Sequence, residues 1–381
     1  MYLSDNLTAW HSAERTSVTS SHSFPHYRVS GPPRERGRAY GAVARREIES
    51  SMVGYARVFD HYQGWSWPEV QRRARGFLPV IADFSPAIAD ELAGIAEGAN
   101  LQIEDVLALN TRSELMFGSG SAIEPLECTA FCLTPEATRT RTYIAGQNWD
   151  WISHARQTSV VLEVRRDDGP DFVTVVEAGL LAKVGFNSAG VGLCTNTLIS
   201  SHSEGKTAVP YHVLLRSVLD SDSGKHAADR IAETDRAISA NYLVFDRSGF
   251  CTDIETTPVA GGYRRLSPTG GVLTHANHFL TAELTERDVY LARKKHTVDR
   301  LRAIDGQLRG RREHTIETLK AALADHTYEP NSVCQHPNAN MPEAERTCTV
   351  AGIIIDVEEA ALHVAPGNPC TTPWSNYHIG M

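Results

Sequence analysis

Residues 125–133 read PLECTAFCL, and residues 142–151 read TYIAGQNWDW. Their β-branched and aromatic residues predict two short strands separated by turn-forming residues. The first of these strands begins at Cys128, shortly after the Gly/Ser-rich segment GSGSA at 118–122. A cysteine at the very start of a strand, just after a segment that breaks regular structure, is the feature from which we argue fold and function.

The predicted secondary structure differs between the two sides of Cys128. Upstream, residues 44–116 follow a helical pattern, in which Ile88, Leu92 and Ile95 recur at steps of three and four. Downstream, short strand-like runs are grouped together and are interrupted by two helical blocks, and the chain closes with an apolar hairpin. The helical blocks are 210–238 and 286–326, and the hairpin is 348–367. Grouped strands and grouped helices predict an α+β fold rather than an alternating parallel sheet.

Composition narrows the class of protein. The chain has 381 residues, 41% hydrophobic and 22% charged, with a net charge of −9. An acidic chain without a basic stripe does not favour nucleic-acid binding. Its apolar runs fall short of the roughly 18–20 residues that cross a bilayer, and the polar N-terminus does not resemble a signal peptide. We therefore expect a cytoplasmic protein with no membrane partner.

The domain prediction is simple. Residues 1–30 are polar and rich in Ser and Thr, and we expect them to be disordered. Residues 31–41, GPPRERGRAYG, predict a turn-rich entry into ordered structure. Residues 31–381 then form a single domain.

Seven cysteines, an odd number without a CxxC pair, argue against both a disulfide framework and a structural zinc site. Cys128 and Cys132 would lie roughly 13 Å apart on one face of a strand, too far to share a bond or a metal. His275 and His278 lack a nearby acidic ligand and are interpreted as ordinary loop histidines. We therefore expect no metal and no cofactor. The remaining cysteines considered, which we interpret as small buried hydrophobes, are Cys132, Cys194, Cys251, Cys334 and Cys370.

Cys128 has a further chemical option because of its position. If the bond between Glu127 and Cys128 were cut, the cysteine would carry both a thiol and a free α-amine. The amine has an ordinary pKa of about 7.7–8.0 and the thiol of about 8.5, so the amine can act as general base for the thiol near neutral pH. The same thiol can make the cut, by attacking the carbonyl of Glu127 to give a thioester that water opens.

The order of several motifs resembles the acyl-coenzyme A:6-aminopenicillanic acid acyltransferase family (isopenicillin N acyltransferase, peptidase family C45), which belongs to the N-terminal nucleophile hydrolases. The pairing of CTAFC (128–132) with GQNWD (146–150) carries most of the resemblance. It continues in NTRSEL (110–115), VGFNSAGVGLCTNTL (184–198), PYHVLLRSVLD (210–220), THANHF (274–279) and TVAGIIIDVEEAALHVAPGNPC (349–370). The resemblance implies a four-layer αββα sandwich that cleaves itself into chains 1–127 and 128–381, which stay associated.

The resemblance also implies roles for individual residues. Cys128 matches the nucleophile of the family, and Asp150 matches the acidic residue that orients it. Asn277 matches an asparagine that donates to the oxyanion. Asn196 resembles the position of a second oxyanion donor, acting through its backbone N–H. The penicillin-forming enzyme of the family has glycine before its nucleophile, whereas this chain has Glu127, whose carboxylate disfavours the thiolate before cutting. The departure leaves the rate of maturation open, and cleavage is still expected.

Two charged residues of the NTRSEL motif leave an open choice. Arg112 and Glu114 lie in the part of the chain that cleavage would separate from Cys128. A structural ion pair and a role in maturation explain them equally well.

The function implied is acyl transfer through an acyl-Cys128 intermediate, on a small-molecule amide, thioester or amine. Both an acyl-CoA-dependent N-acyltransferase and an amide hydrolase fit, and acyl-CoA enters only as a co-substrate. A homo-oligomer is compatible with the sequence. The alternative is an uncleaved, non-catalytic binding or structural protein with the same fold.

Overall fold

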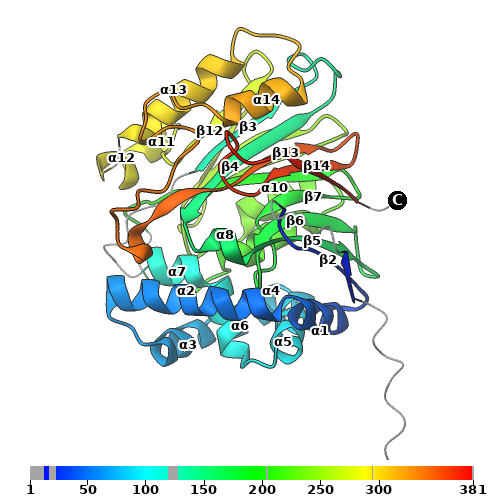
Figure 1. Ribbon diagram of the computed structural model, residues 1–381, viewed down its shortest axis with the longest axis vertical. Helices are drawn as coiled ribbons and strands as arrows, with labels where there is room; N and C mark the ends of the chain where they lie inside the picture. Colours follow the sequence, from blue (N-terminus) through cyan, green and yellow to red (C-terminus); the bar gives the residue numbers. More distant parts are fainter. Residues whose placement is uncertain (1–12, 17–22, 119–127, 203–204, 294, 380–381) are drawn as a thin grey trace, which may run out of the picture.

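Two β-sheets face each other at the centre of the molecule, and helices cover both outer faces (Figure 1). The computed structural model describes residues 13–16, 23–118, 128–202, 205–293 and 295–379. Strands β3 and β4 of one sheet contact β8 of the other, so the two sheets pack face to face. The predicted α+β class and αββα sandwich are confirmed.

The larger sheet has the order β1-β2-β5-β6-β7-β8-β9-β10-β11. All of its neighbouring strands are antiparallel except β2 and β5, which run parallel. The strands are β1 (Ala13–Thr16), β2 (His26–Ser30), β5 (Ser159–Arg165), β6 (Phe172–Glu177), β7 (Val184–Asn187), β8 (Val191–Thr197), β9 (Ala240–Asp246), β10 (Cys251–Thr256) and β11 (Tyr263–Leu266).

The smaller sheet is wholly antiparallel and carries the cysteine in question. Its order is β12-β3-β4-β13-β14-β15. Its strands are β3 (Cys128–Leu133), β4 (Ile144–Ile152), β12 (Val272–His275), β13 (Thr347–Asp356), β14 (Ala361–Ala365) and β15 (Ser375–His378). The predicted C-terminal hairpin is confirmed as β13 and β14.

Helices form the two outer layers. Helices α13 and α14 lie against β3, β4, β12 and β13, whereas α9 and α10 lie against β8, β9 and β10. The N-terminal helices pack beneath the larger sheet, where α1 contacts β2 and α2 contacts β6 (Figure 1). The helices are α1 (Pro33–Val43), α2 (Arg45–Gln63), α3 (Trp67–Arg75), α4 (Leu78–Phe84), α5 (Pro86–Ala99), α6 (Ile103–Asn110), α7 (Arg112–Phe117), α8 (Ala155–Thr158), α9 (Tyr211–Leu219), α10 (Gly224–Glu233), α11 (Ala282–Thr285), α12 (Tyr290–Arg293), α13 (His296–Leu308), α14 (Ile316–Leu323) and the short η1 (Glu343–Glu345).

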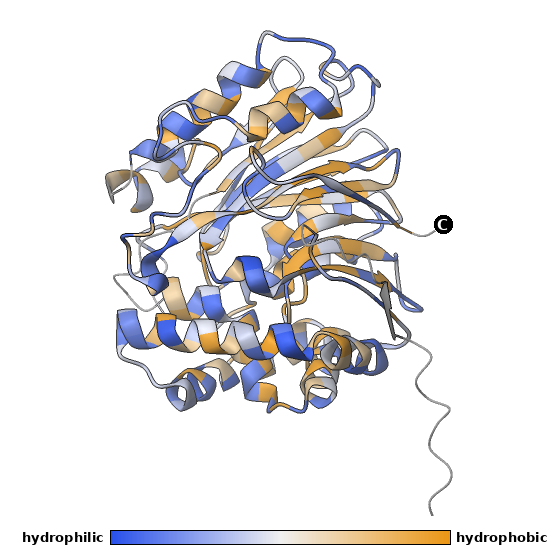
Figure 2. Ribbon diagram, in the orientation of Figure 1, coloured by the Kyte–Doolittle hydropathy of each residue, from blue (hydrophilic) through white to orange (hydrophobic). Residues whose placement is uncertain are grey.

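Strand β3 is buried on both faces because it has a sheet on one side and helices on the other. Cys128 and Cys132 belong to the core between the sheets, whereas Phe131 packs with Ile304 and Leu319 under α13 and α14. This two-sided burial explains why CTAFCL is apolar almost throughout rather than alternating. Figure 2 shows the same division, with apolar residues along the strands and hydrophilic residues on the outer faces of the helices.

The start of the ordered domain differs from the prediction. Residues 26–30 form β2, which pairs in parallel with β5, so the expected disorder of residues 1–30 is wrong for this segment. Residues 33–43 form α1 rather than a turn, because Pro33 occupies the first helical position, where its missing N–H costs nothing. Residues 1–12 and 17–22 lie outside the described residues.

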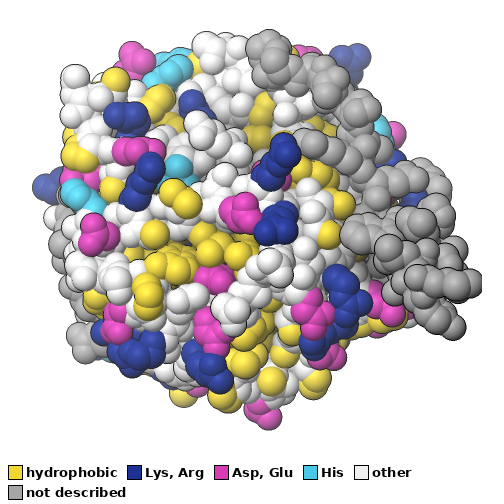
Figure 3. Space-filling view, turned by 60° about the horizontal axis from the view of Figure 1, so that its bottom comes forward, with side chains coloured by type: hydrophobic (Ala, Val, Ile, Leu, Met, Phe, Trp, Pro, Cys, Tyr) yellow, Lys and Arg dark blue, Asp and Glu magenta, His cyan; other side chains and the backbone are white. Residues whose placement is uncertain are grey.

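The surface carries charges of both signs. On the face in Figure 3, Lys and Arg side chains are interspersed with Asp and Glu, and hydrophobic side chains gather between them. None of the described helices is both long enough and apolar enough to cross a membrane.

Candidate active site

Cys128 is the first residue of β3, and its neighbours on the sheet are set by strand register. Antiparallel pairing places it opposite Trp149 of β4. The Cys128 side chain is 2% exposed, and its Sγ lies 3.7 Å from the backbone oxygen of Asp150. The thiol therefore sits in the dry interior between the two sheets, at the end of a strand that rigid neighbours hold on both sides.

Asn277 is the first side chain that fixes the backbone of Cys128. It follows β12, and its Oδ1 accepts a hydrogen bond of 2.6 Å from the Cys128 nitrogen. Its Nδ2 donates to the backbone oxygen of Thr197 at 2.9 Å, and its own N–H donates to Thr297 Oγ1. Asn277 thus lies at the nucleophile, as the resemblance implies, with the oxygen rather than the nitrogen of its amide turned toward Cys128.

Arg300 of α13 is the second side chain that fixes the backbone of Cys128. Its Nη1 donates to the backbone oxygen of Cys128 at 2.5 Å and to Thr129 Oγ1 at 2.9 Å. Its Nη2 donates to Asn277 Oδ1 at 2.9 Å, so one buried guanidinium ties Cys128 and Asn277 together. Sequence analysis missed this residue. The available signal is its place one turn before Ile304 and two turns before Leu308, on the buried stripe of a helix.

Asp150 presents two different groups to its surroundings. Its backbone oxygen faces the Cys128 thiol, whereas its carboxylate accepts a hydrogen bond of 2.6 Å from Thr349 Oγ1. A bulge in the β4–β13 ladder between Thr349 and Ala351 lies directly at this point. Bulges re-aim side chains, and here one sets the hydroxyl of Thr349 on the Asp150 carboxylate.

Asn196 of β8 has a buried side chain with no partner. Neither Oδ1 nor Nδ2 makes a hydrogen bond among the described residues, although the residue is fully buried. Its backbone N–H is already taken, because it donates to Asn241 Oδ1 at 2.7 Å. If Asn196 supplies a donor to a ligand, the free group is therefore its side-chain amide and not the backbone N–H expected from the resemblance.

Lys183, just before β7, provides a buried positive charge. Burial raises the pKa of the Cys128 thiol to about 11, and the nearby Lys183 and Arg300 act in the opposite direction. Burial lowers the pKa of Lys183 to about 8, while the charge of Cys128 opposes that shift. The Lys183 ammonium donates to Tyr211 Oη at 3.0 Å. The sequence signal for Lys183 is a lone lysine within the apolar run GLLAKVGF.

Arg112 and Glu114 do not pair with each other. Arg112 forms a buried ion pair with Glu177 and also donates to Tyr55 Oη at 2.5 Å. Glu114 accepts a hydrogen bond of 2.7 Å from the Tyr211 N–H, and burial raises the pKa of its carboxyl to about 7. The ion pair considered from the sequence thus exists for Arg112, with a partner on β6.

The structure also bears on the interpretations of the histidines and the cysteines. The interpretation of His275 as a loop histidine without an acidic neighbour is wrong, because it ends β12 and bonds Glu255 Oε1 at 2.9 Å. His278 does lie in a loop, 3.0 Å from Thr297 Oγ1. The interpretation as buried hydrophobes is wrong for Cys370, which is exposed, and for Cys251, which is only half-buried. Glu127, the residue before the predicted cut, lies outside the described residues.

Comparison with known proteins identifies the family of this chain. A family model described as acyl-coenzyme A:6-aminopenicillanic acid acyl-transferase matches residues 137–369, more than half of the chain. The chain belongs to that family. The matched part begins downstream of Cys128 and includes Asp150, Asn196, Asn277 and Arg300.

Two curated relatives give the extent of the likeness. The chain is 28% identical over 255 residues to the 40 kDa form of the acyl-coenzyme A:6-aminopenicillanic-acid acyltransferase of Emericella nidulans, which spans 67% of this chain and 69% of the relative. It is 24% identical over 236 residues to protein dcd1A of Dictyostelium discoideum, covering 55% of this chain and 53% of that protein.

Solved structures similar to this acyltransferase-family chain include two hydrolases. A mutant of the conjugated bile acid hydrolase of Clostridium perfringens matches with a TM-score of 0.46 at 13% identity, over 66% of this chain and 97% of that one. The penicillin V acylase of Agrobacterium tumefaciens matches with a TM-score of 0.44 at 14% identity, over 66% and 86%.

Proposed function

We propose that the chain cuts its own Glu127–Cys128 bond and then uses Cys128 to transfer acyl groups. The observation that carries the proposal is the way Cys128 is held, with its nitrogen on Asn277 Oδ1 and its carbonyl oxygen on Arg300. A cysteine that only fills the core does not require side chains that fix both its backbone nitrogen and its carbonyl oxygen.

Self-cleavage begins with the thiol. Cys128 Sγ attacks the carbonyl carbon of Glu127, the C–N bond breaks, and the nitrogen leaves protonated as the α-amine of Cys128. The resulting thioester is opened by water, which gives a carboxylate on Glu127 and regenerates the thiol. The hydrogen bond between Asn277 Oδ1 and the nitrogen of Cys128 then holds the new amine beside the thiol that it serves as base.

Acyl transfer uses the same atoms. The Cys128 thiol gives its proton to its own α-amine and attacks the carbonyl of a thioester or amide. The leaving thiol or amine takes a proton and departs, and an amine or water then attacks acyl-Cys128. The uncommitted amide of Asn196 is the donor that we assign to the oxyanion. Asn277, whose Oδ1 accepts from the Cys128 nitrogen and whose Nδ2 donates to Thr197, positions the nucleophile instead. Thr349 holds the carboxylate of Asp150 in one orientation.

The substrate class follows from the family only in part. The Emericella nidulans relative is by its name an acyl-coenzyme A-dependent acyltransferase. We propose a small-molecule acyl thioester or amide as the donor, with either an amine or water as the acceptor.

Intact-mass measurement of freshly purified protein tests self-cleavage. Two chains ending and beginning at the 127–128 bond support the proposal, whereas one uncut chain of 41.8 kDa favours the non-catalytic binding protein. Cys128→Ala should abolish the cut, and Cys132→Ala, on the same face of β3, should not. If Cys128→Ala still splits at this bond, an external protease makes the cut and the mechanism is wrong.

Acyl transfer is tested separately. The mature protein is incubated with a panel of acyl thioesters and acyl amides and then quenched in acid. An acyl mass on the 128–381 chain, absent from Cys128→Ala, identifies the donor. Chase with an amine or with buffer alone separates a transferase from a hydrolase.

A further inference from the structure

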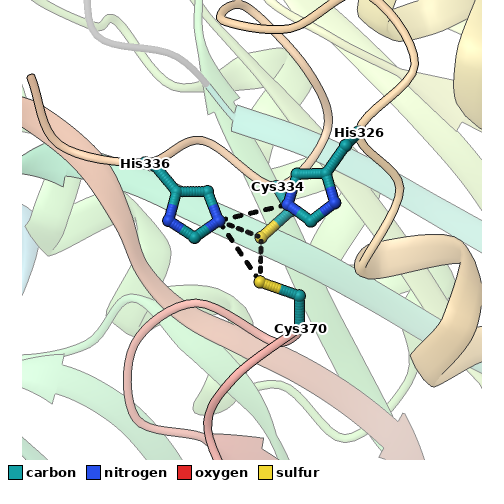
Figure 4. A group of neighbouring side chains, drawn as sticks. All are labelled: His326, Cys334, His336 and Cys370. Atoms are coloured by element: carbon teal, nitrogen blue, oxygen red, sulfur yellow. Dashed lines mark hydrogen bonds between the residues drawn. The ribbon is translucent and has the colours of Figure 1, made fainter.

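Two histidines and two cysteines lie close together in loops that connect to the smaller sheet (Figure 4). They are His326, Cys334, His336 and Cys370, and one ligand atom from each lies within 4.8 Å of all the others. The sequence predicts no zinc site, because its cysteines and histidines lack the close spacing of zinc-binding motifs. In the folded chain, Cys370 lies next to three residues from which it is separated in sequence by strands β13 and β14.

The distances fit a tetrahedral ion. The two sulfur atoms are 3.6 Å apart, and the two histidine Nε2 atoms are 3.1 Å apart. His336 Nε2 lies 3.2 Å from Cys370 Sγ and 4.0 Å from Cys334 Sγ. Zinc bonds of about 2.3 Å to sulfur and about 2.0–2.1 Å to nitrogen place tetrahedral ligand atoms roughly 3.3–3.8 Å from one another. The observed separations scatter around that range.

Competing explanations of the cluster fit less well. A disulfide requires the sulfur atoms to be about 2.05 Å apart, and these are 3.6 Å apart. A tetrahedral set of two sulfur and two nitrogen ligands is typical of zinc among the common biological metals. Asn368 Nδ2 also donates to Cys334 Sγ at 3.3 Å, the kind of outer contact that supports a metal-bound thiolate.

The location of the cluster indicates a structural role for such an ion. Residues 324–342 form a long connection with no helix or strand, and His326, Cys334 and His336 all lie within it. Cys370 lies in the loop between β14 and β15. Long connections without regular structure are uncommon in a compact domain unless something fixes them. One ion bound by all four residues would join this connection to the β14–β15 loop.

We propose that His326, Cys334, His336 and Cys370 form a structural zinc site. Both cysteines bind as thiolates, so two thiol protons pass to solvent when the ion binds, and both histidines bind as neutral imidazoles. The two negative charges balance Zn²⁺, and with four protein ligands the ion has no open position for a substrate.

The site is joined to the nucleophile region by hydrogen bonds. Gln335 lies between two of the ligands, and its N–H donates to Thr349 Oγ1 at 2.9 Å. Thr349 N–H donates back to the Gln335 oxygen at 2.9 Å, while its hydroxyl donates to Asp150. The proposed zinc site is therefore linked to the Asp150 carboxylate through Gln335 and Thr349; any consequence for catalysis rests on the proposed function, but the metal site does not.

The metal content of the protein tests the site directly. The full chain is purified without a metal-affinity step, passed through gel filtration and analysed by mass spectrometry for metals. We expect about one zinc per chain. Replacing zinc with Co²⁺ should give the intense visible and near-ultraviolet bands of tetrahedral cobalt bound to thiolates, and this measurement needs no variant.

Variants assign the ligands. Cys370→Ser and His336→Asn change exposed residues, so we expect folded protein with at least a tenfold loss of zinc. Cys251→Ser changes a half-buried cysteine outside the cluster and should keep the wild-type zinc content. Zinc retained in both ligand variants overturns the assignment. The assignment is also overturned if the wild-type protein binds neither zinc nor cobalt. A Cys334–Cys370 disulfide found by peptide mapping of fresh, unreduced protein would overturn it as well.

Discussion

The guanidinium of Arg300 donates one hydrogen bond to the carbonyl oxygen of Cys128 and another to the side chain of Asn277, whose oxygen in turn accepts from the Cys128 nitrogen. The first residue of β3 is therefore held at both its nitrogen and its carbonyl by a closed set of three residues. A charged, forked donor is well suited to this, because hydrogen bonds from ionised groups are roughly twice as strong as neutral ones.

Removing the guanidinium of Arg300 should slow self-cleavage. We expect Arg300→Met to reduce the rate of self-cleavage at least tenfold, since the carbonyl of Cys128 and Asn277 both lose their donor, and Arg300→Lys to recover only part of it. The rate is read from the time course of cut chain in cell-free synthesis. Arg302→Met, on an exposed position of the same helix, is the control and should cut normally. Normal cutting by Arg300→Met would show that the contact is not needed.

The candidate site divides into a part that the sequence predicts and a part that it does not. Cys128 and Asp150 lie on strands whose patterns and motifs are readable, and Asn277 lies in a motif of its own. Arg300 and Thr349 reach the site through packing and through a strand bulge, neither of which leaves a mark in local spacing. The α+β class was predictable because strand-like and helix-like segments are grouped along the chain, whereas the αββα layer order came from the family resemblance.

The early start of the domain and the cluster around Cys334 were missed for the same physical reason. Strand β2 is short and owes its stability to pairing with β5, far along the chain. The cluster depends on two loops meeting, although its ligands are scattered from His326 to Cys370. Contacts of this kind come from tertiary structure, so composition and periodicity carry little information about them.

Lys183 should tune the reactivity of the nucleophile. Its positive charge opposes the effect of burial on the Cys128 thiol, but the pKa of Lys183 is itself lowered to about 8. Lys183→Met is therefore expected to raise the pKa of that thiol and to slow its alkylation below about pH 8, with the difference from wild type shrinking above that pH. A rise of one pKa unit lowers the thiolate fraction at neutral pH about tenfold. The measurement is the rate of Cys128 alkylation between pH 7 and pH 10, followed by peptide mass spectrometry.

The matched control for this experiment is Lys225→Met, which removes an exposed lysine of α10. It should alkylate at the wild-type rate throughout the pH range. An unchanged pH profile for Lys183→Met would mean that its ammonium does not act on the thiol.

Stability should fall as pH rises because of His275. Burial alone would lower the pKa of this histidine, but Asp253 and Glu255 outweigh it and raise the pKa to about 9. A group whose pKa is raised in the folded state stabilises the fold fully below its unfolded pKa of about 6.5, and the contribution is lost as pH rises through about 9. For this buried histidine, a shift of that size corresponds to a contribution on the order of 3 kcal/mol.

Denaturant unfolding at pH 6 and at pH 9 measures this contribution. We expect His275→Asn to destabilise the protein at pH 6 and to do so much less at pH 9, so that the difference from wild type shrinks with pH. His378→Asn, at an exposed position of β15, should show no such trend. A constant difference between wild type and His275→Asn would contradict the raised pKa.

Asn196 allows stability and activity to be separated. Its buried amide makes no hydrogen bond to any residue that the structure describes, and an unsatisfied buried polar group costs about 1–3 kcal/mol. Asn196→Leu removes that cost at similar volume, so the melting temperature should rise or stay unchanged. If the amide donates to the oxyanion, however, kcat for acyl transfer should fall by about 10²–10³ while KM changes little. The control is Asn241→Leu, which removes an amide that bonds Asp253 and the Asn196 N–H, and should lower the melting temperature. A variant Asn196→Leu that melts lower and keeps its kcat would mean that the residue serves the fold and not the reaction.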